Sequence, residues 1–206
     1  MHLLFLCSGG SGAVFAFTNK PNHDDSQSLN KVAIKVSWKA SKATVQNECE
    51  ILQTLESYNV PHVEQCIAQT PYLSDRVMIA LTPVVTDRTS SITNLGPMAK
   101  QNAVREVVET MVGMLLANVI TFDVQPLFSD KGEALFIDFT EAKHLLSPPD
   151  LIGIVGFCNE MITLIPENDR EDAAAYLKLL LRDFEKRGVA LQREVSDVVE
   201  SIWFEL

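Results

Sequence analysis

The sequence predicts an α+β fold, with a β-rich first half that contains one helix and a mainly helical second half. Short apolar runs bounded by glycine and polar residues recur up to residue 81, which is typical of strands. After Gly96 the apolar residues recur at helical spacing instead. With 206 residues and 47% hydrophobic composition, the chain is long enough to bury one or two small cores. We therefore expect two domains, residues 1–85 and 86–206.

Three apolar runs near the start predict strands, at residues 3–6, 13–17 and 32–36. A Ser/Gly cluster separates the first two runs, and the polar residues 18–30 separate the second from the third. The expected order is therefore strand, glycine turn, strand, long hairpin loop and strand.

One helix and one more strand complete the first half. Apolar residues at helical spacing predict a helix over residues 42–55, which Asn59-Val60-Pro61 ends. Residues 76–81 (RVMIAL) predict a strand, and the Thr/Ser-rich segment after Pro83 predicts a connector to the second half.

The second half begins with a predicted helix that Gly96-Pro97 opens and that runs to residue 117. Two short strands are predicted at residues 127–128 and 134–137, around a turn in which Gly132 supplies a positive φ. Three further helices are predicted, over residues 150–165, 169–187 and 191–203.

Charge and hydropathy exclude two classes of partner. A net charge of −10 and a pI near 4.8 argue against binding to a nucleic-acid backbone. The opening MHLLFLC is too short for a membrane span, so no membrane partner is expected. Because no Lys or Arg precedes it, it favours a first strand over a signal peptide, which is the alternative. A chain that begins directly at this strand leaves a truncated gene model or an excised domain open.

The cysteines have no pattern typical of a metal site or a disulfide framework, since there is no CxxC pair and no histidine at zinc-finger spacing. They predict reduced core thiols and a cytoplasmic location. The four are Cys7, Cys49, Cys66 and Cys158.

A lysine on a predicted buried strand is the first candidate for chemistry. Lys35 lies between Ile34 and Val36, where an ammonium is costly unless it is paired with a carboxylate. A carboxylate nearby is therefore expected, and the following helix offers Glu48 and Glu50, which point about 200° apart around it. The alternatives are a strand-end lysine that reaches solvent and a glutamate on a solvated helix face.

Three more segments accompany this pair: SGGSGAV at residues 8–14, ITFDVQP at 120–126 and IDFT at 137–140. With the segment VAIK at residues 32–35, their order over residues 1–145 resembles the protein kinase superfamily. The resemblance implies a two-lobed protein kinase-like fold, with an antiparallel β-rich N-lobe carrying one helix and a small, mainly helical C-lobe.

The resemblance implies an ATP site in the first domain. Glycines in the loop would present backbone N–H groups to the phosphates, and Lys35 would pair with the α- and β-phosphates and with Glu48. Cys7 stands in place of the loop's first glycine, and a plain hairpin turn is the alternative for this loop. The implied residues are Gly9, Gly10, Gly12, Val14, Ala33, Lys35 and Glu48.

Two aspartates would act in the second domain. Asp138 resembles the metal-binding aspartate of the family's DFG segment, with Thr140 in place of glycine, so the implied cofactors are ATP and Mg²⁺. Asp123 resembles the catalytic aspartate that accepts or orients the proton of the acceptor hydroxyl. A helix cap or a turn is the alternative for Asp138.

The catalytic segment departs from the family pattern. Thr121 and Phe122 replace its histidine and arginine, and Phe128 stands where the second metal-binding residue, an asparagine, is expected. The two aspartates are also closer in sequence than in the family, and the segment after Asp138 is short and lacks an Ala-Pro-Glu signature. We therefore expect no peptide-docking platform of the usual kind.

These observations favour an ATP- and Mg²⁺-dependent phosphotransferase, Ser/Thr protein kinase-like, that acts on a hydroxyl of an unknown protein or small-molecule acceptor. The alternative is a catalytically impaired pseudokinase that serves as a nucleotide-binding interaction module. A scaffold that no longer binds nucleotide is a third reading. His62 and His144 have no clustered partners in the sequence, so neither is predicted as a ligand or general base.

Overall fold

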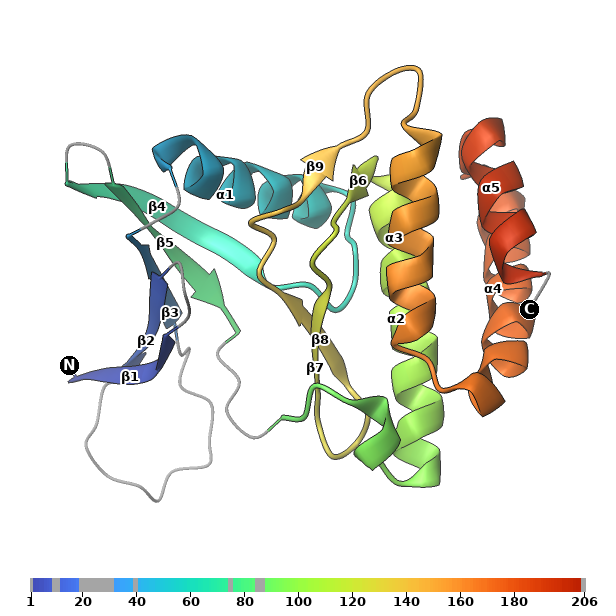
Figure 1. Cartoon of the computed structure of the whole chain (residues 1–206), viewed down its shortest axis with the longest axis horizontal. Coiled ribbons are helices and arrows are strands. Elements are labelled where there is room, and N and C mark those ends of the chain that lie inside the picture. The colour runs from blue at the N-terminus through green and yellow to red at the C-terminus, as the bar shows by residue number, and fades with distance from the viewer. Residues whose placement is uncertain are drawn as a thin grey trace. The chain divides into compact units, whose positions relative to one another are not determined.

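The computed structural model describes residues 2–8, 12–18, 32–38, 41–73, 76–83 and 88–204 (Figure 1). The chain divides into two compact units. The first comprises Met1–Gln53 and Glu64–Thr86, and the second comprises Thr54–Val63 and Asp87–Leu206. The loop that follows the first helix therefore belongs with the second unit, although it is flanked by segments of the first.

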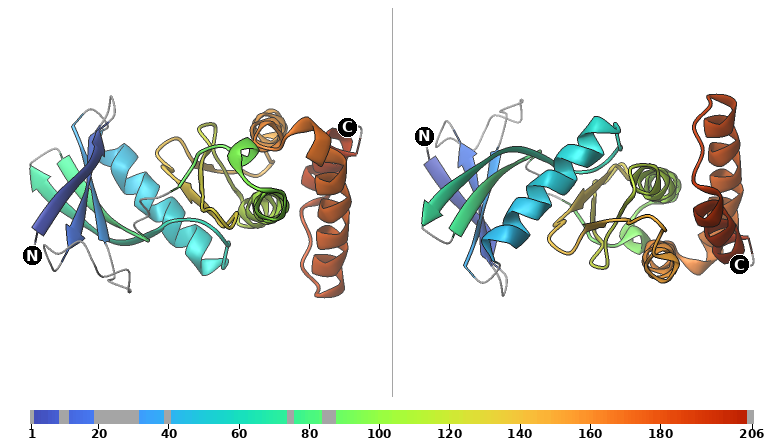
Figure 2. Two further views of the ribbon diagram at one scale, coloured as in Figure 1. Left: turned by 90° about the horizontal axis from the view of Figure 1, so that it is seen from below. Right: turned by 90° about the horizontal axis from the view of Figure 1, so that it is seen from above.

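The first unit is a five-stranded antiparallel sheet in the order β1-β2-β3-β5-β4, with helix α1. Both views of Figure 2 place α1 across one face of this sheet. The predicted strands and helix of this half are confirmed. The elements are β1 (His2–Ser8), β2 (Gly12–Thr18), β3 (Val32–Ser37), α1 (Lys42–Ser57), β4 (Gln65–Leu73) and β5 (Arg76–Thr82).

Helix α1 follows from local chemistry and from burial. The hydroxyl of Ser41 accepts a hydrogen bond from the backbone N–H of Thr44 at 3.1 Å, which caps the helix start. Its buried stripe faces the sheet, where strand β5 alternates strictly between buried and half-buried residues. The buried residues of the two elements are Val45, Glu48, Cys49, Ile51, Leu52, Leu55, Val77, Ile79 and Leu81.

Strand β4 was not predicted from the sequence, because its apolar alternation is broken. Its pairing with β5 shifts register between Cys66 and Ala68 and again between Pro71 and Leu73. A proline is tolerated there because β4 is an edge strand, bonded only to β5 in this sheet.

The second unit is mainly helical, and its predicted helices and hairpin are confirmed (Figure 1). Two short strands, β6 and β9, pair with each other and were not predicted. The elements are η1 (Ile92–Asn94), α2 (Pro97–Leu116), β6 (Val119–Ile120), β7 (Gln125–Phe128), β8 (Ala134–Ile137), β9 (Lys143–His144), α3 (Leu151–Thr163), η2 (Glu167–Asp169), α4 (Arg170–Lys186) and α5 (Arg193–Trp203).

Helix α2 forms the centre of this unit, and the hairpin turn packs on its first turn. Gly132 has the predicted positive φ, of 81°, and a Cβ at this position would lie 1.9 Å from the carbonyl oxygen of Ala99. Only glycine fits there, since both the backbone conformation and the space exclude a side chain. The largest fully buried side chains of the unit include Met111, Met114, Ile120, Phe128, Phe139, Phe157 and Trp203.

The cysteines differ from expectation. Cys49 of α1 and Cys66 of β4 form a disulfide with an S–S distance of 2.05 Å, so the prediction of reduced thiols is wrong for these two residues. Their sequence separation of 17 carries no motif, and only the packing of α1 on the sheet brings them together. Cys158 is a buried free thiol whose pKa burial raises to about 12. The cytoplasmic location stays a prediction. Within the described part of the chain, no helix is both long and apolar enough to cross a bilayer.

Candidate functional site

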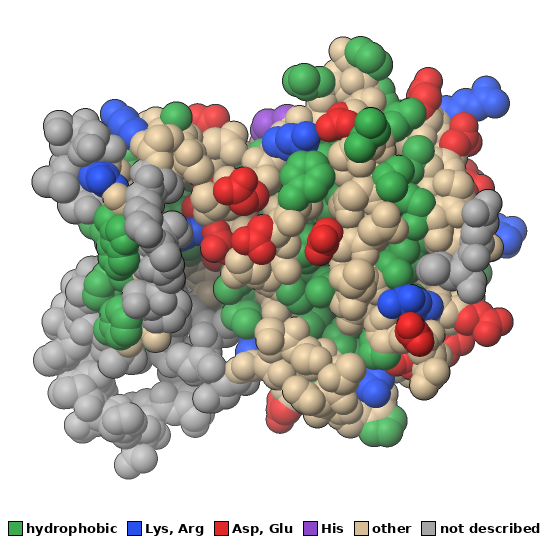
Figure 3. All heavy atoms as spheres, in the orientation of Figure 1, with side chains coloured by type: hydrophobic (Ala, Val, Ile, Leu, Met, Phe, Trp, Pro, Cys, Tyr) green, Lys and Arg blue, Asp and Glu red, His purple; other side chains and the backbone are tan. Residues whose placement is uncertain are grey.

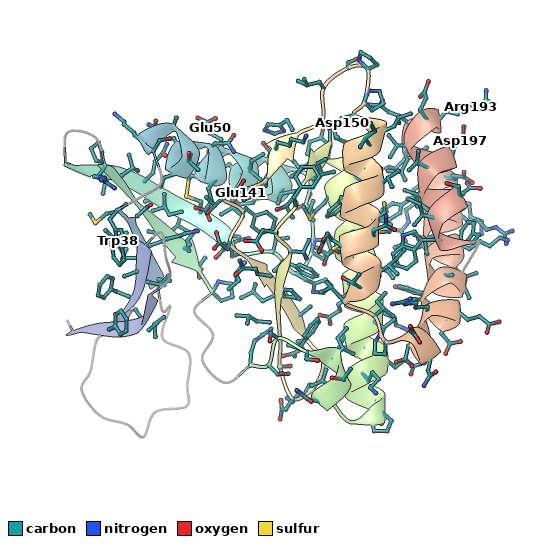
Figure 4. All side chains as sticks on the ribbon, in the orientation of Figure 1. Trp38, Glu50, Glu141, Asp150, Arg193 and Asp197 are labelled. Carbon is teal, nitrogen blue, oxygen red and sulfur yellow. A yellow bond between two sulfur atoms is a disulfide. The ribbon has the colours of Figure 1, made fainter. Side chains whose placement is uncertain are left out.

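The first unit contains the ion pair that the sequence predicts. The Nζ of Lys35 lies 2.7 Å from Oε1 of Glu48. The Glu48 side chain is 0% exposed and that of Lys35 is 15% exposed. Glu50, two residues further along α1, is exposed (Figure 4). The pairing of Lys35 with Glu48, and not with Glu50, is therefore confirmed.

The position of Lys35 is determined by the sheet. Strand β3 lies between β2 and β5, and Lys35 is opposite Val14 on one side and Ile79 on the other. Hydrogen bonding on both sides holds the backbone of β3 at this position. Because α1 covers the same face, a buried carboxylate on its inner side meets the ammonium of Lys35, which keeps a small exposed fraction.

The other residues of the implied nucleotide site are only partly described. Val14 is half-buried, and Ala33 is buried opposite Ala16 and Leu81. Gly12 begins β2 opposite Ser37. Gly9 and Gly10 lie outside the described residues, so the proposed phosphate-binding role of the loop stays a prediction.

Asp138 directly follows β8 in an uncommon backbone conformation. Its φ is 61°, which costs a residue other than glycine about 1–3 kcal/mol unless its surroundings hold it there. The hydroxyl of Thr140 donates a hydrogen bond to Oδ1 of Asp138 at 2.5 Å, and Phe139 between them is buried. Thr140 therefore restrains this carboxylate.

Asp123 is exposed in the turn before β7, where its carboxylate accepts a hydrogen bond from Nε2 of Gln125 at 2.8 Å. Its backbone N–H donates to the hydroxyl of buried Thr121 at 3.3 Å. Gln125 pairs with Ile137 in the β7–β8 hairpin, so Asp123 and Asp138 flank the same end of that hairpin. Two aspartates that are 15 positions apart in the chain thus lie at the same end of one hairpin.

Phe122 lies on the surface of the second unit. Its ring is 45% exposed, and the Nζ of Lys143 lies 4.8 Å from the ring centroid. A Cβ at Gly156 of α3 would be 3.4 Å from the ring, which shows that Phe122 lies against this helix. Figure 3 shows hydrophobic side chains gathered on this face, to which α3 contributes the exposed residues Leu151, Ile152 and Val155.

His62 has partners that sequence reasoning missed. Its Nδ1 lies 3.2 Å from Oε2 of Glu106, and its Nε2 lies 3.1 Å from Oε2 of Glu109, both on α2. The hydroxyl of Tyr176 on α4 donates to Glu109, and burial, followed by that bond, raises the pKa of Tyr176 to about 12. The prediction that His62 lacks clustered partners is therefore wrong. No spacing rule would have found them, because the loop and α2 are distant in sequence.

This histidine cluster is best described as structural. His62 has a φ of 60°, and its carbonyl oxygen accepts the backbone N–H of Phe136 at 2.7 Å. The ring of His62 therefore holds the loop after α1 against α2, and its carbonyl oxygen holds the same loop against β8. Among the described residues, no group of three or more His, Cys, Asp or Glu side chains is placed to hold a metal ion.

The candidate residues divide between the two units: Lys35 and Glu48 belong to the first, and Asp123 and Asp138 belong to the second. No protein-family model and no curated protein sequence matches the chain. What the chain does must therefore be argued from the contacts of these four side chains.

Proposed function

We propose that this chain is a protein kinase-like, ATP-binding protein that transfers a phosphoryl group from ATP, with Mg²⁺, to an acceptor hydroxyl. In this proposal the first unit is the N-lobe and the second a reduced C-lobe of a protein kinase-like fold. The observation that carries the proposal is the buried pair of Lys35 and Glu48 on β3 and α1.

A buried ion pair is poor evidence for stability, because desolvation of the two charges offsets much of their attraction. An apolar pair of similar volume would hold α1 on the sheet as well. A lysine kept at the centre of a sheet, with a fully buried carboxylate to orient its ammonium, is better explained by a need for a positioned cation. A nucleotide phosphate is a ligand that such a cation fits.

Each residue then has one role. Lys35 contacts the α- and β-phosphates, Glu48 orients it, and the backbone of Gly9, Gly10 and Gly12 covers the phosphates beside Val14 and Ala33. Asp123 orients the acceptor hydroxyl and accepts its proton. Catalysis in this scheme consists of positioning and charge neutralisation, without a covalent intermediate.

The donor set fits a metal that arrives with the nucleotide. Asp138 supplies one carboxylate in a restrained conformation, and the described residues offer no larger acidic cluster around it. Mg²⁺ commonly takes one or two carboxylates and completes its shell with phosphate oxygens and water. When bound, the ion would neutralise charge on the transferred phosphoryl group.

A pseudokinase is the second candidate function, and one observation favours it. Phe128, in the place of the second metal-binding residue, is 1% exposed and forms a β-bridge with Thr89 in the core of the second unit. Its position therefore supplies packing and no ligand. Phe122 likewise supplies an apolar surface where the family has a cation. A protein of this kind would bind ATP and transfer phosphate poorly or not at all.

Two measurements test the proposal. The first is the affinity for ATP with Mg²⁺, by calorimetry, of the wild type, of Lys35→Ala and of Lys42→Ala, a matched exposed lysine at the start of α1. We expect a loss of about 10-fold or more for Lys35→Ala, as one charge-assisted contact predicts, and no change for Lys42→Ala. Equal affinities of the three proteins would reject the nucleotide site.

The second measurement is transfer of labelled γ-phosphate to the protein itself or to a generic acceptor. If transfer occurs, Asp123→Asn should slow it by about 10²-fold or more, the usual contribution of a positioned base. A wild type that binds ATP but transfers nothing favours the pseudokinase. A rate unchanged by Asp123→Asn would remove the role given to that residue.

A further inference from the structure

The disulfide between Cys49 and Cys66 adjoins the candidate nucleotide site within the first unit. Cys49 is the residue next to Glu48 on α1, and Cys66 lies on β4. We propose that this disulfide is a redox-dependent positioning link, which holds Glu48 opposite Lys35 and whose reduction loosens that ion pair. Its consequence for ATP binding rests on the proposed function, whereas its effect on Lys35 does not.

The disulfide joins α1 to β4, and β4 is connected through β5 to β3, which carries Lys35. Lys35 is opposite Ile79 on β5, and two residues further along β5 Leu81 is opposite both Ala33 and Cys66. Residues two apart on a strand share a face, and residues opposite each other across an antiparallel pair also share one. Cys66 and Lys35 therefore lie on the buried face of the sheet that α1 covers.

Without the disulfide, apolar packing would still hold α1 on the sheet, but apolar packing tolerates small shifts. A rotation of the helix by one residue position moves a side chain by about 100° around its axis, and an ion pair is far more sensitive to such a shift than a contact between Leu52 and the sheet. The covalent bond is at Cys49, the residue next to Glu48, so it restrains rotation and translation of α1 at the position of the carboxylate.

The reduction step is an ordinary thiol–disulfide exchange with a dithiol reductant. One thiolate of the reductant attacks a sulfur of the pair, forms a mixed disulfide with that cysteine and releases the other cysteine as a thiolate. The second thiol of the reductant then attacks its own sulfur in the mixed disulfide and releases the first cysteine. Two electrons and two protons end on Cys49 and Cys66, and the reductant leaves as its own disulfide. Both cysteines are buried, so access requires local opening. The edge strand β4, with its register shift immediately after Cys66, is the place where such opening costs least.

The test uses the full chain in a Cys7→Ser/Cys158→Ser background, so that only this pair can react. The oxidised protein and the protein treated with dithiothreitol are compared by the rate at which an amine-acylating reagent modifies Lys35, measured by mass spectrometry across a range of pH. We expect Lys35 to react at least three times faster after reduction, with its pH profile shifted, while Lys42 and Lys143 react at unchanged rates. ATP affinity is measured on the same samples, and we expect it to fall at least fivefold.

A second variant separates loss of the link from loss of the fold. Cys49→Ala/Cys66→Val keeps the site apolar and filled without a covalent bond, and its far-ultraviolet circular dichroism establishes that it is folded. We expect its Lys35 reactivity to match the reduced protein and to be insensitive to dithiothreitol. Serine at both positions provides a polar control for the same comparison.

The outcomes are distinguishable. Lys35 reactivity that is equal in the oxidised protein, the reduced protein and the Ala/Val variant would overturn the proposal, even if ATP binds to all three. If mass spectrometry finds Cys49 and Cys66 as free thiols in protein purified without reductant, the proposal is overturned as well. A change in Lys35 reactivity without ATP binding in any form would support the positioning link and reject the proposed function.

Discussion

Replacing Glu48 by glutamine is the sharpest perturbation of the first unit, because it removes one charge and almost no volume. The substitution leaves the ammonium of Lys35, 15% exposed, facing an uncharged amide. We expect Glu48→Gln to lower the free energy of unfolding of this unit, and to do so far more than a surface substitution would.

The magnitude follows from the geometry. With the charged atoms 2.7 Å apart, their Coulomb attraction at an effective dielectric constant of about 20 is about 6 kcal/mol. Desolvation of both groups offsets much of this, and removal of one member of a buried pair costs about 3–5 kcal/mol in practice. Because Lys35 keeps a route to solvent, we expect the lower end of that range, about 3 kcal/mol.

The assay exploits the two tryptophans of the chain, one in each unit. Trp38 directly follows β3 in the first unit (Figure 4), and Trp203 is buried in the second. In a Trp203→Phe background, fluorescence during urea unfolding therefore reports the first unit. Glu50→Gln, at an exposed position of α1 within the first unit, is the matched control and should change stability by less than about 1 kcal/mol.

A double-mutant cycle decides whether the cost belongs to the pair. Lys35→Met and Glu48→Gln each remove one charge of the ion pair and leave the other, whereas the double variant removes both charges. We expect the double variant to lose less stability than the sum of the single variants by about 2 kcal/mol or more. A single cost below about 1 kcal/mol, or strict additivity, would refute the reasoning about the buried pair.

Three further outcomes follow from other contacts. Reduction of the Cys49–Cys66 disulfide, with a sequence separation of 17, should destabilise the first unit by about 3 kcal/mol from loop entropy, and an unchanged urea midpoint of Trp38 fluorescence would contradict this. In the second unit, Gly132→Ala brings a Cβ to within 1.9 Å of a carbonyl oxygen and should lower the free energy of unfolding by about 3 kcal/mol or more. Gly188→Ala, with a φ of 76° and open space around it, should lower it by only about 1–2 kcal/mol. Trp203 fluorescence during unfolding reports both variants, and equal losses would be inconsistent with the close contact at Gly132. Burial raises the pKa of Cys158 from 9.0 to about 12, so this thiol should resist alkylation at pH 8 in the folded protein, and rapid alkylation would show that the site is open. Because the thiol of the unfolded chain loses its proton first, the free energy of unfolding should fall as the pH rises from about 9 towards 12.

The pattern of apolar residues was enough to predict most of the elements. Strand β5 alternates as a half-buried strand must, and α2 begins at Gly96-Pro97 as its sequence predicts. Strand β4 escaped prediction because two register shifts break its alternation, and β6 and β9 are too short to show a period. Such elements form because neighbouring strands or loops complete their hydrogen bonds, and those neighbours are not local in sequence.

The candidate site shows the same division. A lysine in an apolar strand predicted a carboxylate partner, because a buried ammonium is costly unless it is paired, and the resemblance to the protein kinase superfamily pointed to Glu48 as that partner. The restraint of Asp138 by Thr140 and the contacts of His62 with Glu106 and Glu109 were not predictable, because each depends on where a backbone turn points a side chain.

By itself, then, the sequence determined the α+β order of elements, the helix and strands of each half, and the need for a carboxylate beside Lys35. Periodicity and the cost of a buried charge are local or nearly local properties, and they can be evaluated without coordinates. Only the tertiary structure decided that Cys49 and Cys66 form a disulfide and that His62 contacts Glu106 and Glu109. Both depend on which residues the packing brings within bonding distance, and that is set by how the helices, the sheet and the loop pack and not by spacing along the chain.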